Sequence, residues 1–159
     1  MDKKLDTDFF EKVVIYNLLT NPSYLGTVIG TVQPEFFNDK NTSNIVKVIC
    51  DFFSERGEAP TVTEVKAHLD TDELKETFRK VVNTFSDIDT KFNKDELLEN
   101  TERFLKERAV YNTMLDVAGE CNDGNIDTSK ILDKFEQACN INLSADIGLE
   151  FFSQIDTHI

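Results

Sequence analysis

Apolar residues recur at helical spacing along nearly the whole chain. The clearest case is the segment 42–55, where the spacing i, i+3, i+4, i+7, i+8 describes the positions of Ile45, Val48, Ile49, Phe52 and Phe53. That spacing places these side chains on one face of a helix. No stretch alternates apolar and polar residues for long enough to predict a strand. The pattern therefore predicts an all-α fold.

The first 92 residues predict a compact helical head. Its first helix is expected to begin near Asp8, which can cap it with Glu11 three residues later, and to end at Asn21-Pro22. A short apolar segment follows, and Pro34 is then well placed in the first turn of a brief helix. One face of the first helix is expected to pack inward through Phe10, Val13, Val14, Asn17 and Leu18.

The second part of the head has clear helix boundaries. The helix over 42–55 is expected to close at Arg56-Gly57, a basic residue followed by a C-terminal glycine. Thr61 and Glu64 form a capping-box pattern that opens the next helix. A last helix starts at Asp70 or Thr71 and runs to about residue 85, before a linker over 86–92.

The segment 93–144 predicts an αα-hairpin. A cap at Asn93 opens a helix of about 26 residues, or about 39 Å, which ends near Gly119. A turn-rich stretch leads to a second cap at Asp127 or Thr128. The final, shorter helix is expected to face inward through Ile131, Leu132, Phe135, Ala138 and Cys139.

The long helix carries more apolar surface than one shorter partner helix can cover. Its apolar positions are Leu97, Phe104, Leu105, Tyr111, Leu115 and Ala118. Either the head folds back over this stripe, or the hairpin of a second subunit pairs with it in an isologous contact. Periodicity alone does not choose between the two.

Charge and composition favour protein partners. The net charge of -13 and the pI near 4.5 make attraction to nucleic acid or to an anionic membrane unfavourable. The three cysteines are odd in number and far apart, which fits a reducing cytoplasm, and Cys50 and Cys139 are expected to be inert residues of apolar faces. The first residues hold no apolar signal core, and no run is apolar enough to span a membrane.

No pattern of catalytic, nucleotide-binding or metal-binding residues stands out. None of the six glycines begins the phosphate-binding pattern GxxxxGK[ST], and no GxSxG nucleophile elbow is present. His68 and His158 lack a cysteine at zinc-ligand spacing, and neither follows a glutamate by three residues as in di-metal helical hydrolases. A calcium-type loop at Asp87 and Asp89 lacks the glycine that its turn requires. The sequence therefore predicts a chain with no catalytic, cofactor or metal site.

Several short strings have a recognisable order. The head carries Leu18-Leu19-x-Asn21-Pro22-x-Tyr24-Leu25, Pro34-Glu35-Phe36-Phe37, Asn44-Ile45 with Ile49, and Gly57-x-x-Pro60-Thr61. The hairpin adds Thr101-Glu102-Arg103-Phe104, Arg108-Ala109-x-x-Asn112 and Gln137-Ala138, followed by an exit segment over 146–156. Together these strings resemble the N-terminal domain of DnaB-like replicative DNA helicases, and the T-even phage branch in particular.

The resemblance implies the collar of a hexameric 5′ to 3′ helicase in the cytoplasm. In such proteins, paired N-terminal domains lie above a ring of motor domains, and primase and helicase loader dock on or near them. ATP and Mg²⁺ would belong to the motor domain and not to this chain. Residues 145–159 would begin the linker to the motor, with Phe151, Phe152 and Ile155 docking on a neighbouring subunit.

The resemblance also favours self-association of the hairpin. The expected interface consists of Leu97, Phe104, Arg108, Tyr111, Leu115, Ile131, Phe135 and Ala138. The alternative function is that of a stand-alone acidic helical protein, such as an adaptor, a helicase loader or a DNA-mimic inhibitor, for which the net charge of -13 is the supporting feature.

Overall fold

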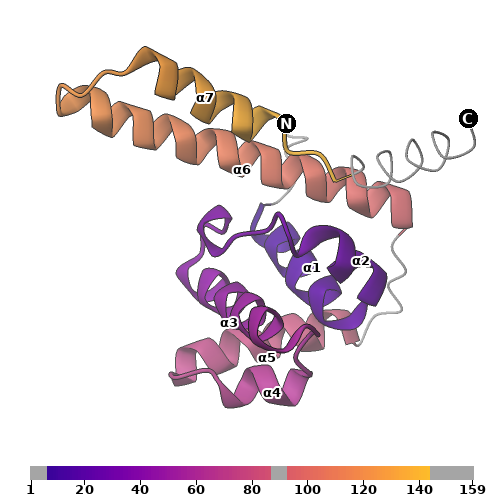
Figure 1. The fold of residues 1–159 in the computed structure, drawn as a ribbon. Coiled ribbons are helices and arrows are strands. Elements are labelled where there is room, and N and C mark those ends of the chain that lie inside the picture. Colours follow the sequence, from indigo (N-terminus) through magenta and orange to yellow (C-terminus); the bar gives the residue numbers. More distant parts are fainter. Residues whose placement is uncertain (1–6, 87–92, 144–159) are drawn as a thin grey trace, which may run out of the picture. The chain divides into compact units, whose positions relative to one another are not determined.

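The computed structural model describes residues 7–86 and 93–143, and these residues form helices joined by short connections (Figure 1). The described residues contain no strand, so the all-α prediction is confirmed. The chain divides into two compact units, Met1–Phe92 and Asn93–Ile159.

The first unit is the helical head. Its elements are, in order, α1 (Thr7–Thr20), α2 (Pro22–Val28), the 3-10 helix η1 (Pro34–Phe36), α3 (Lys40–Arg56), α4 (Val62–Ala67) and α5 (Asp72–Ser86). Helix α1 packs against α2, α3 and α5, and α3 also packs against α5, η1 and α4. Helices α1 and α3 are therefore the centre of the head.

The core of the head is built from the apolar faces that the sequence pattern predicts. Helix α1 buries Phe10, Val13, Val14 and Leu18, together with the side chain of Asn17. Asn17 remains satisfied because its amide donates to the carbonyl of Val13 at 2.9 Å. Other fully buried members of this core are Val28, Ile45, Val46, Ile49, Val65, Phe78 and Val81. At about 1.5–3 kcal/mol for each large apolar side chain, their burial is the main force that holds the head together.

The helix ends of the head are fixed by local capping. Asn21 accepts a hydrogen bond from the backbone N–H of Tyr24 at 3.1 Å and caps α2. Gly57 ends α3 with a φ of 76°, a left-handed conformation that favours glycine. Thr61 and Glu64 bond to each other's backbone N–H groups, which confirms the capping box that opens α4. These boundaries were predictable because each depends on a few neighbouring residues.

The second unit holds the hairpin of α6 (Lys94–Asn122) and α7 (Thr128–Cys139). Asn93 and Asp127 cap the two helices through their side-chain oxygens, as expected. The predicted end of α6 at Gly119 is wrong, since the helix continues to Asn122. The left-handed residue is Gly124, with a φ of 82°. There the N–H of Asn125 bonds to the carbonyl of Glu120 at 2.9 Å, which is the pattern of a Schellman end.

The predicted cap at the start of α1 is also wrong. Asp8 lies inside the first turn of α1 instead of before it, and Glu11 makes a tertiary contact instead of a capping box. One carboxylate oxygen of Glu11 accepts from the backbone N–H of Asn38 at 2.8 Å, and the other lies 2.7 Å from the hydroxyl of Thr42. Because Glu11 is fully buried, it joins α1 to the first turn of α3 through the interior of the head.

Burial and hydrogen bonding act on Glu11 in opposite directions. Burial disfavours the charged carboxylate and raises its pKa, whereas the bonds from Thr42 and from the backbone of Asn38 and Asp39 favour the charge. Burial is the larger effect, so the pKa of Glu11 is raised. Whatever the charge of Glu11, the backbone N–H groups at the start of α3 lack an acceptor within the helix. They therefore need one at the position of the Glu11 side chain.

Replacing Glu11 by Ala should lower the free energy of unfolding of the chain by about 1–3 kcal/mol, because the N–H of Asn38 loses its buried acceptor. Glu11→Gln keeps the shape and one acceptor oxygen and should cost less. Urea denaturation followed by circular dichroism measures both values. Equal losses in the two variants would contradict the role given to the acceptor.

The raised pKa of Glu11 also predicts a pH dependence. A carboxyl group whose pKa is higher in the folded than in the unfolded chain stabilises the fold while it is protonated, and this contribution is lost as pH rises through the folded-state pKa. The wild type should therefore lose stability relative to Glu11→Gln as the pH is raised through that range. Denaturation of both proteins between acidic and neutral pH measures this difference.

Candidate protein-interaction surface

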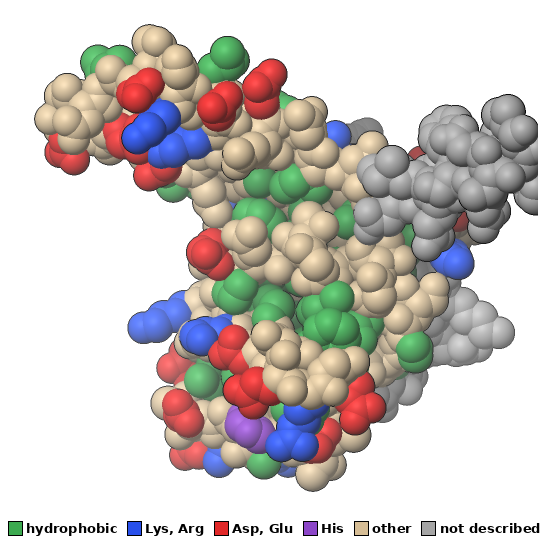
Figure 2. All heavy atoms as spheres, in the orientation of Figure 1, with side chains coloured by type: hydrophobic (Ala, Val, Ile, Leu, Met, Phe, Trp, Pro, Cys, Tyr) green, Lys and Arg blue, Asp and Glu red, His purple; other side chains and the backbone are tan. Residues whose placement is uncertain are grey.

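An ionic clamp joins the two helices of the hairpin near its turn. The ammonium group of Lys134 on α7 bonds to the carboxylate of Asp116 at 2.7 Å and also to that of Glu120, both on α6. These bonds raise the pKa of Lys134. Figure 2 shows acidic and basic side chains gathered toward the turn end of the hairpin. The clamp fixes the register of α7 along α6.

The inner face of α7 is narrower than the sequence predicts. Ile131 and Phe135 are half-buried and Ala138 is buried, at the spacing that places them beside Lys134 on one side of the helix. The predictions for Leu132 and Cys139 are wrong, because Leu132 is 61% exposed and Cys139 is exposed. Each follows an inward residue by one position, which turns it by about 100° around the helix, away from the single partner helix.

The segment after α7 returns along α6. The backbone N–H of Leu143 donates to a carboxylate oxygen of Glu102 at 2.9 Å, and the side chain of Leu143 is buried. Lys106 lies 4.0 Å from the other oxygen of Glu102. This contact fixes where the described chain leaves the hairpin.

The N-terminal half of α6 is well covered. Leu97, Thr101, Phe104, Leu105 and Ala109 are all buried. Two of the residues expected at an interface between subunits are Leu97 and Phe104. Because both are buried within the chain, they expose too little surface to contribute much to such an interface. Three others, Ile131, Phe135 and Ala138, face α6 within the same hairpin.

The C-terminal half of α6 carries an uncovered apolar face. Tyr111, Met114 and Leu115 are 48%, 54% and 57% exposed, and Ala118 is exposed as well. The spacing i, i+3, i+4, i+7 places these four residues on one side of α6. We call them the α6 face. Of the residues that sequence reasoning assigned to an interface, Tyr111 and Leu115 belong to it, and Met114 was missed although it has the same spacing.

A positive charge borders the α6 face. The guanidinium carbon of Arg108 lies 4.9 Å from the centroid of the Tyr111 ring, which is a cation-π arrangement. Arg108 is half-buried and precedes Tyr111 by three residues, so it extends the face by one turn toward the start of α6. The apolar side chains are thus continuous with a fixed cation.

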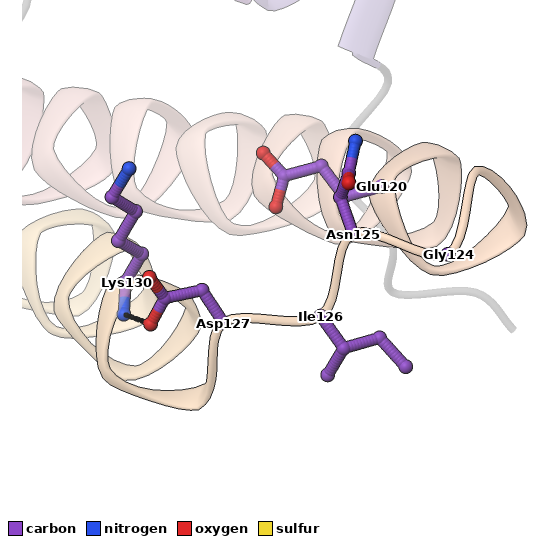
Figure 3. A pocket seen from close by; sticks show the side chains of 6 residues that line it. All are labelled: Glu120, Gly124, Asn125, Ile126, Asp127 and Lys130. Atoms are coloured by element: carbon purple, nitrogen blue, oxygen red, sulfur yellow. Dashed lines mark hydrogen bonds between the residues drawn. The ribbon is translucent and has the colours of Figure 1, made fainter.

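A shallow hollow of about 540 Å³ lies at the turn of the hairpin (Figure 3). It is lined by Glu120, Gly124, Asn125, Ile126, Asp127 and Lys130. Asp127 caps α7 and Glu120 holds Lys134, so both carboxylates already have partners. Ile126 is 63% exposed and points away from the helices in Figure 3. The hollow has the character of an open surface and does not resemble an enclosed catalytic site.

The described residues contain neither a cluster of metal-binding side chains nor a membrane-spanning helix. Among residues 7–86 and 93–143, no group of three or more His, Cys, Asp or Glu side chains is placed to hold a metal ion. None of the helices in those ranges is both long and apolar enough to cross a membrane. The linker-docking candidates Phe151, Phe152 and Ile155 lie outside the described residues.

The cysteines differ in their surroundings. Cys50 is half-buried on α3, and burial raises the pKa of its thiol to about 11, which keeps it protonated and unreactive at neutral pH. Cys121 and Cys139 are exposed at the ends of α6 and α7. Only the expectation for Cys50 fits the structure.

A helical head followed by a long hairpin defines an all-helical domain. The model of the DnaB-like helicase N-terminal domain family matches residues 7–107. The chain belongs to this family, and the part of the helicase that is matched is the N-terminal domain, not a motor. The match covers the described head and the first half of α6, whereas the α6 face lies beyond it. No curated protein sequence gives a significant match to the chain.

Replacing Lys134 by Met should loosen the hairpin, because Met keeps most of the apolar stem and removes the charge that holds Asp116 and Glu120. Amide exchange in α7, measured by NMR, should become several-fold faster at low salt. Lys130→Met serves as the control, because the charged end of Lys130 makes no ion pair with α6. If both variants exchange like the wild type, the clamp does not hold the hairpin.

Proposed function

We propose that this chain is the N-terminal collar domain of a hexameric replicative DNA helicase of the T-even phage type. In this proposal it performs no chemistry, associates with copies of itself, and provides a docking surface for primase or a helicase loader. ATP and Mg²⁺ would act on a separate motor domain. The family membership and the α6 face support the proposal.

The α6 face is the observation that carries this proposal. Tyr111, Met114 and Leu115 are large side chains, and about half of each remains exposed in the chain. Burying a large apolar side chain is worth about 1.5–3 kcal/mol, so covering their exposed halves gains several kcal/mol at most. Bringing two proteins together costs about 4–15 kcal/mol. Two isolated copies of the chain would therefore associate only weakly through the α6 face. Within a ring of subunits the same contact would be stable, because several contacts act together.

The turn end of the hairpin is the best candidate for docking another protein. Ile126 and Leu132 are the two most exposed of the large apolar side chains in the described residues, and the carboxylates of Glu120 and Asp127 line the same hollow as Ile126. A partner with an apolar residue flanked by basic ones would fit this surface. Such a patch on primase or on a helicase loader would support the proposed docking of that protein at the turn end of the hairpin.

The net charge of -13 favours one alternative, a stand-alone acidic adaptor, helicase loader or DNA-mimic inhibitor. The gene distinguishes the two. A reading frame that continues past residue 159 into a domain with a GxxxxGK[ST] motif would support the collar. A stop codon directly after it would support the alternative.

Replacing Leu115 by Asp should weaken self-association of the chain at least tenfold, because a charge would have to be buried in the apolar contact. Leu132→Asp is the matched control, since Leu132 is equally exposed but lies on α7 and outside the α6 face. Sedimentation equilibrium at micromolar to millimolar concentrations measures the association constants. A wild type that stays monomeric throughout would count against the collar, and equal effects of the two substitutions would remove the α6 face from the interface.

A further inference from the structure

Asp123-Gly124, at the C-terminal end of α6, is the only place in the sequence where glycine directly follows an aspartate. We infer that this pair is a site of spontaneous aspartate isomerisation, and that the closed end of α6 sets the rate of the reaction. The reaction needs only the chain and water. The inference stands apart from the proposed function, because it concerns the chemistry of the chain itself.

Isomerisation begins with ring closure between two neighbouring groups of the chain. The backbone nitrogen of Gly124 attacks the protonated side-chain carboxyl carbon of Asp123. A bond between nitrogen and carbon forms, the N–H proton and the carboxyl OH leave as water, and the product is a cyclic succinimide. Water then adds to one of the two ring carbonyls and breaks its bond to nitrogen. Addition at the side-chain carbonyl restores aspartate, whereas addition at the main-chain carbonyl gives isoaspartate, with no net gain or loss of atoms.

The glycine makes this aspartate more reactive than the others in the chain. Every other aspartate is followed by a residue with a side chain, which obstructs the approach of its nitrogen to the carboxyl group. Around Gly124, no heavy atom in the described part of the chain, apart from its own neighbours in sequence, lies within 4 Å of the position that a Cβ would take. Asp123 and Gly124 are also both exposed, so water has access to the ring.

The closed end of α6 holds the two reacting groups apart. Asp123 has a ψ of -3°, which turns the nitrogen of Gly124 away from the Asp123 side chain. The N–H of Gly124 donates to the carbonyl of Cys121 at 3.1 Å. Ring closure therefore needs a large rotation about the Cα–C bond of Asp123 and the loss of this hydrogen bond. The helix end must open before the reaction can occur.

Few contacts hold this turn closed. Residues 121–130 are all exposed, so the turn has no buried side chain of its own. Segments with few buried contacts open locally at a low cost in free energy. The nearest restraint is the ionic clamp, because Lys134 holds the carboxylate of Glu120. The backbone carbonyl of Glu120 accepts the hydrogen bond from Asn125 at 2.9 Å, so the clamp stabilises the residue on which the helix end is built.

The rate of isomerisation should follow the fraction of chains in which the turn is open. Opening and closing of short segments are much faster than succinimide formation, so the open form is in equilibrium with the closed one. Isoaspartate then inserts one methylene group into the backbone between the Cα of Asp123 and the nitrogen of Gly124. The hydrogen bond from Asn125 to Glu120 no longer spans the same number of atoms, so the end of α6 cannot close in its original form.

Ageing of the 159-residue chain at physiological temperature and neutral pH tests the inference. Trypsin then releases residues 109–130 as one peptide, because this range contains Lys or Arg only at its last position. An isoaspartate-specific methyltransferase quantifies isoaspartate in this peptide, and fragmentation in a mass spectrometer assigns it to position 123. A synthetic peptide of residues 109–130 gives the rate in the absence of the fold.

The folded chain should form isoaspartate at position 123 several-fold more slowly than the peptide. Asp123→Glu should abolish the signal, because glutamate must close a larger ring. Lys134→Met should raise the rate several-fold, since it releases Glu120. Lys106→Met is the matched control, because Lys106 pairs with Glu102 on α6, far from the turn. Circular dichroism checks that each variant keeps its helices.

High salt provides a test that needs no variant. Because salt screens the ion pairs of Lys134, it should raise the rate in the wild type and have less effect in Lys134→Met. Absence of isoaspartate at position 123 over a period in which the peptide converts would overturn the modification site. A folded chain that converts as fast as the peptide, or a rate that neither Lys134→Met nor salt changes, would overturn the control by the closed helix end.

Discussion

The unequal lengths of the two hairpin helices are the constraint on which the rest of the account depends. Helix α6 has 29 residues and α7 has 12, or about 44 Å against about 18 Å. A helix covers only one side of its partner, so a short α7 leaves a second side of α6 uncovered along their shared length. Lys134 fixes which side α7 takes, and the opposite side is the α6 face.

The head, in contrast to the hairpin, covers the apolar faces of its helices within one chain. Helices α1 and α3 each have several partners, so their apolar faces are closed and the polar groups between them must be satisfied internally. Glu11 and Asn17 do this inside the core. The head therefore needs no second copy to complete its core, whereas the hairpin retains apolar surface. This difference explains why the proposed self-association is assigned to α6.

Local patterns in the sequence predicted the helices and most of their caps, because these depend on a few adjacent residues. Thr61 with Glu64, Asn93 and Asp127 are examples. Tertiary contacts were less predictable. Glu11 has the spacing of a capping residue, but its partners Asn38 and Thr42 are about thirty residues away along the chain. Gly119 was expected to end α6, yet a glycine within a helix is tolerated and the left-handed turn occurs at Gly124.

The candidate surface was predicted only in part for a similar reason. The periodicity of α6 identified Tyr111 and Leu115 as apolar positions on one long helix, but it could not divide that helix into covered and uncovered faces. That division depends on where α7 packs and on the residues it buries, including Ile131 and Phe135. Met114 was missed although it has the same spacing as Tyr111, Leu115 and Ala118. The family membership was predictable, because the strings that carry it are local patterns in both the head and the hairpin.

The measurement that tests the central claim most directly is hydrogen–deuterium exchange of the chain over a wide range of protein concentration. Protection in the part of α6 around 111–118 should increase with concentration, while α1 to α5 should exchange at the same rates throughout. Exchange in α6 that does not change with concentration, or protection that develops only in the head, would contradict it.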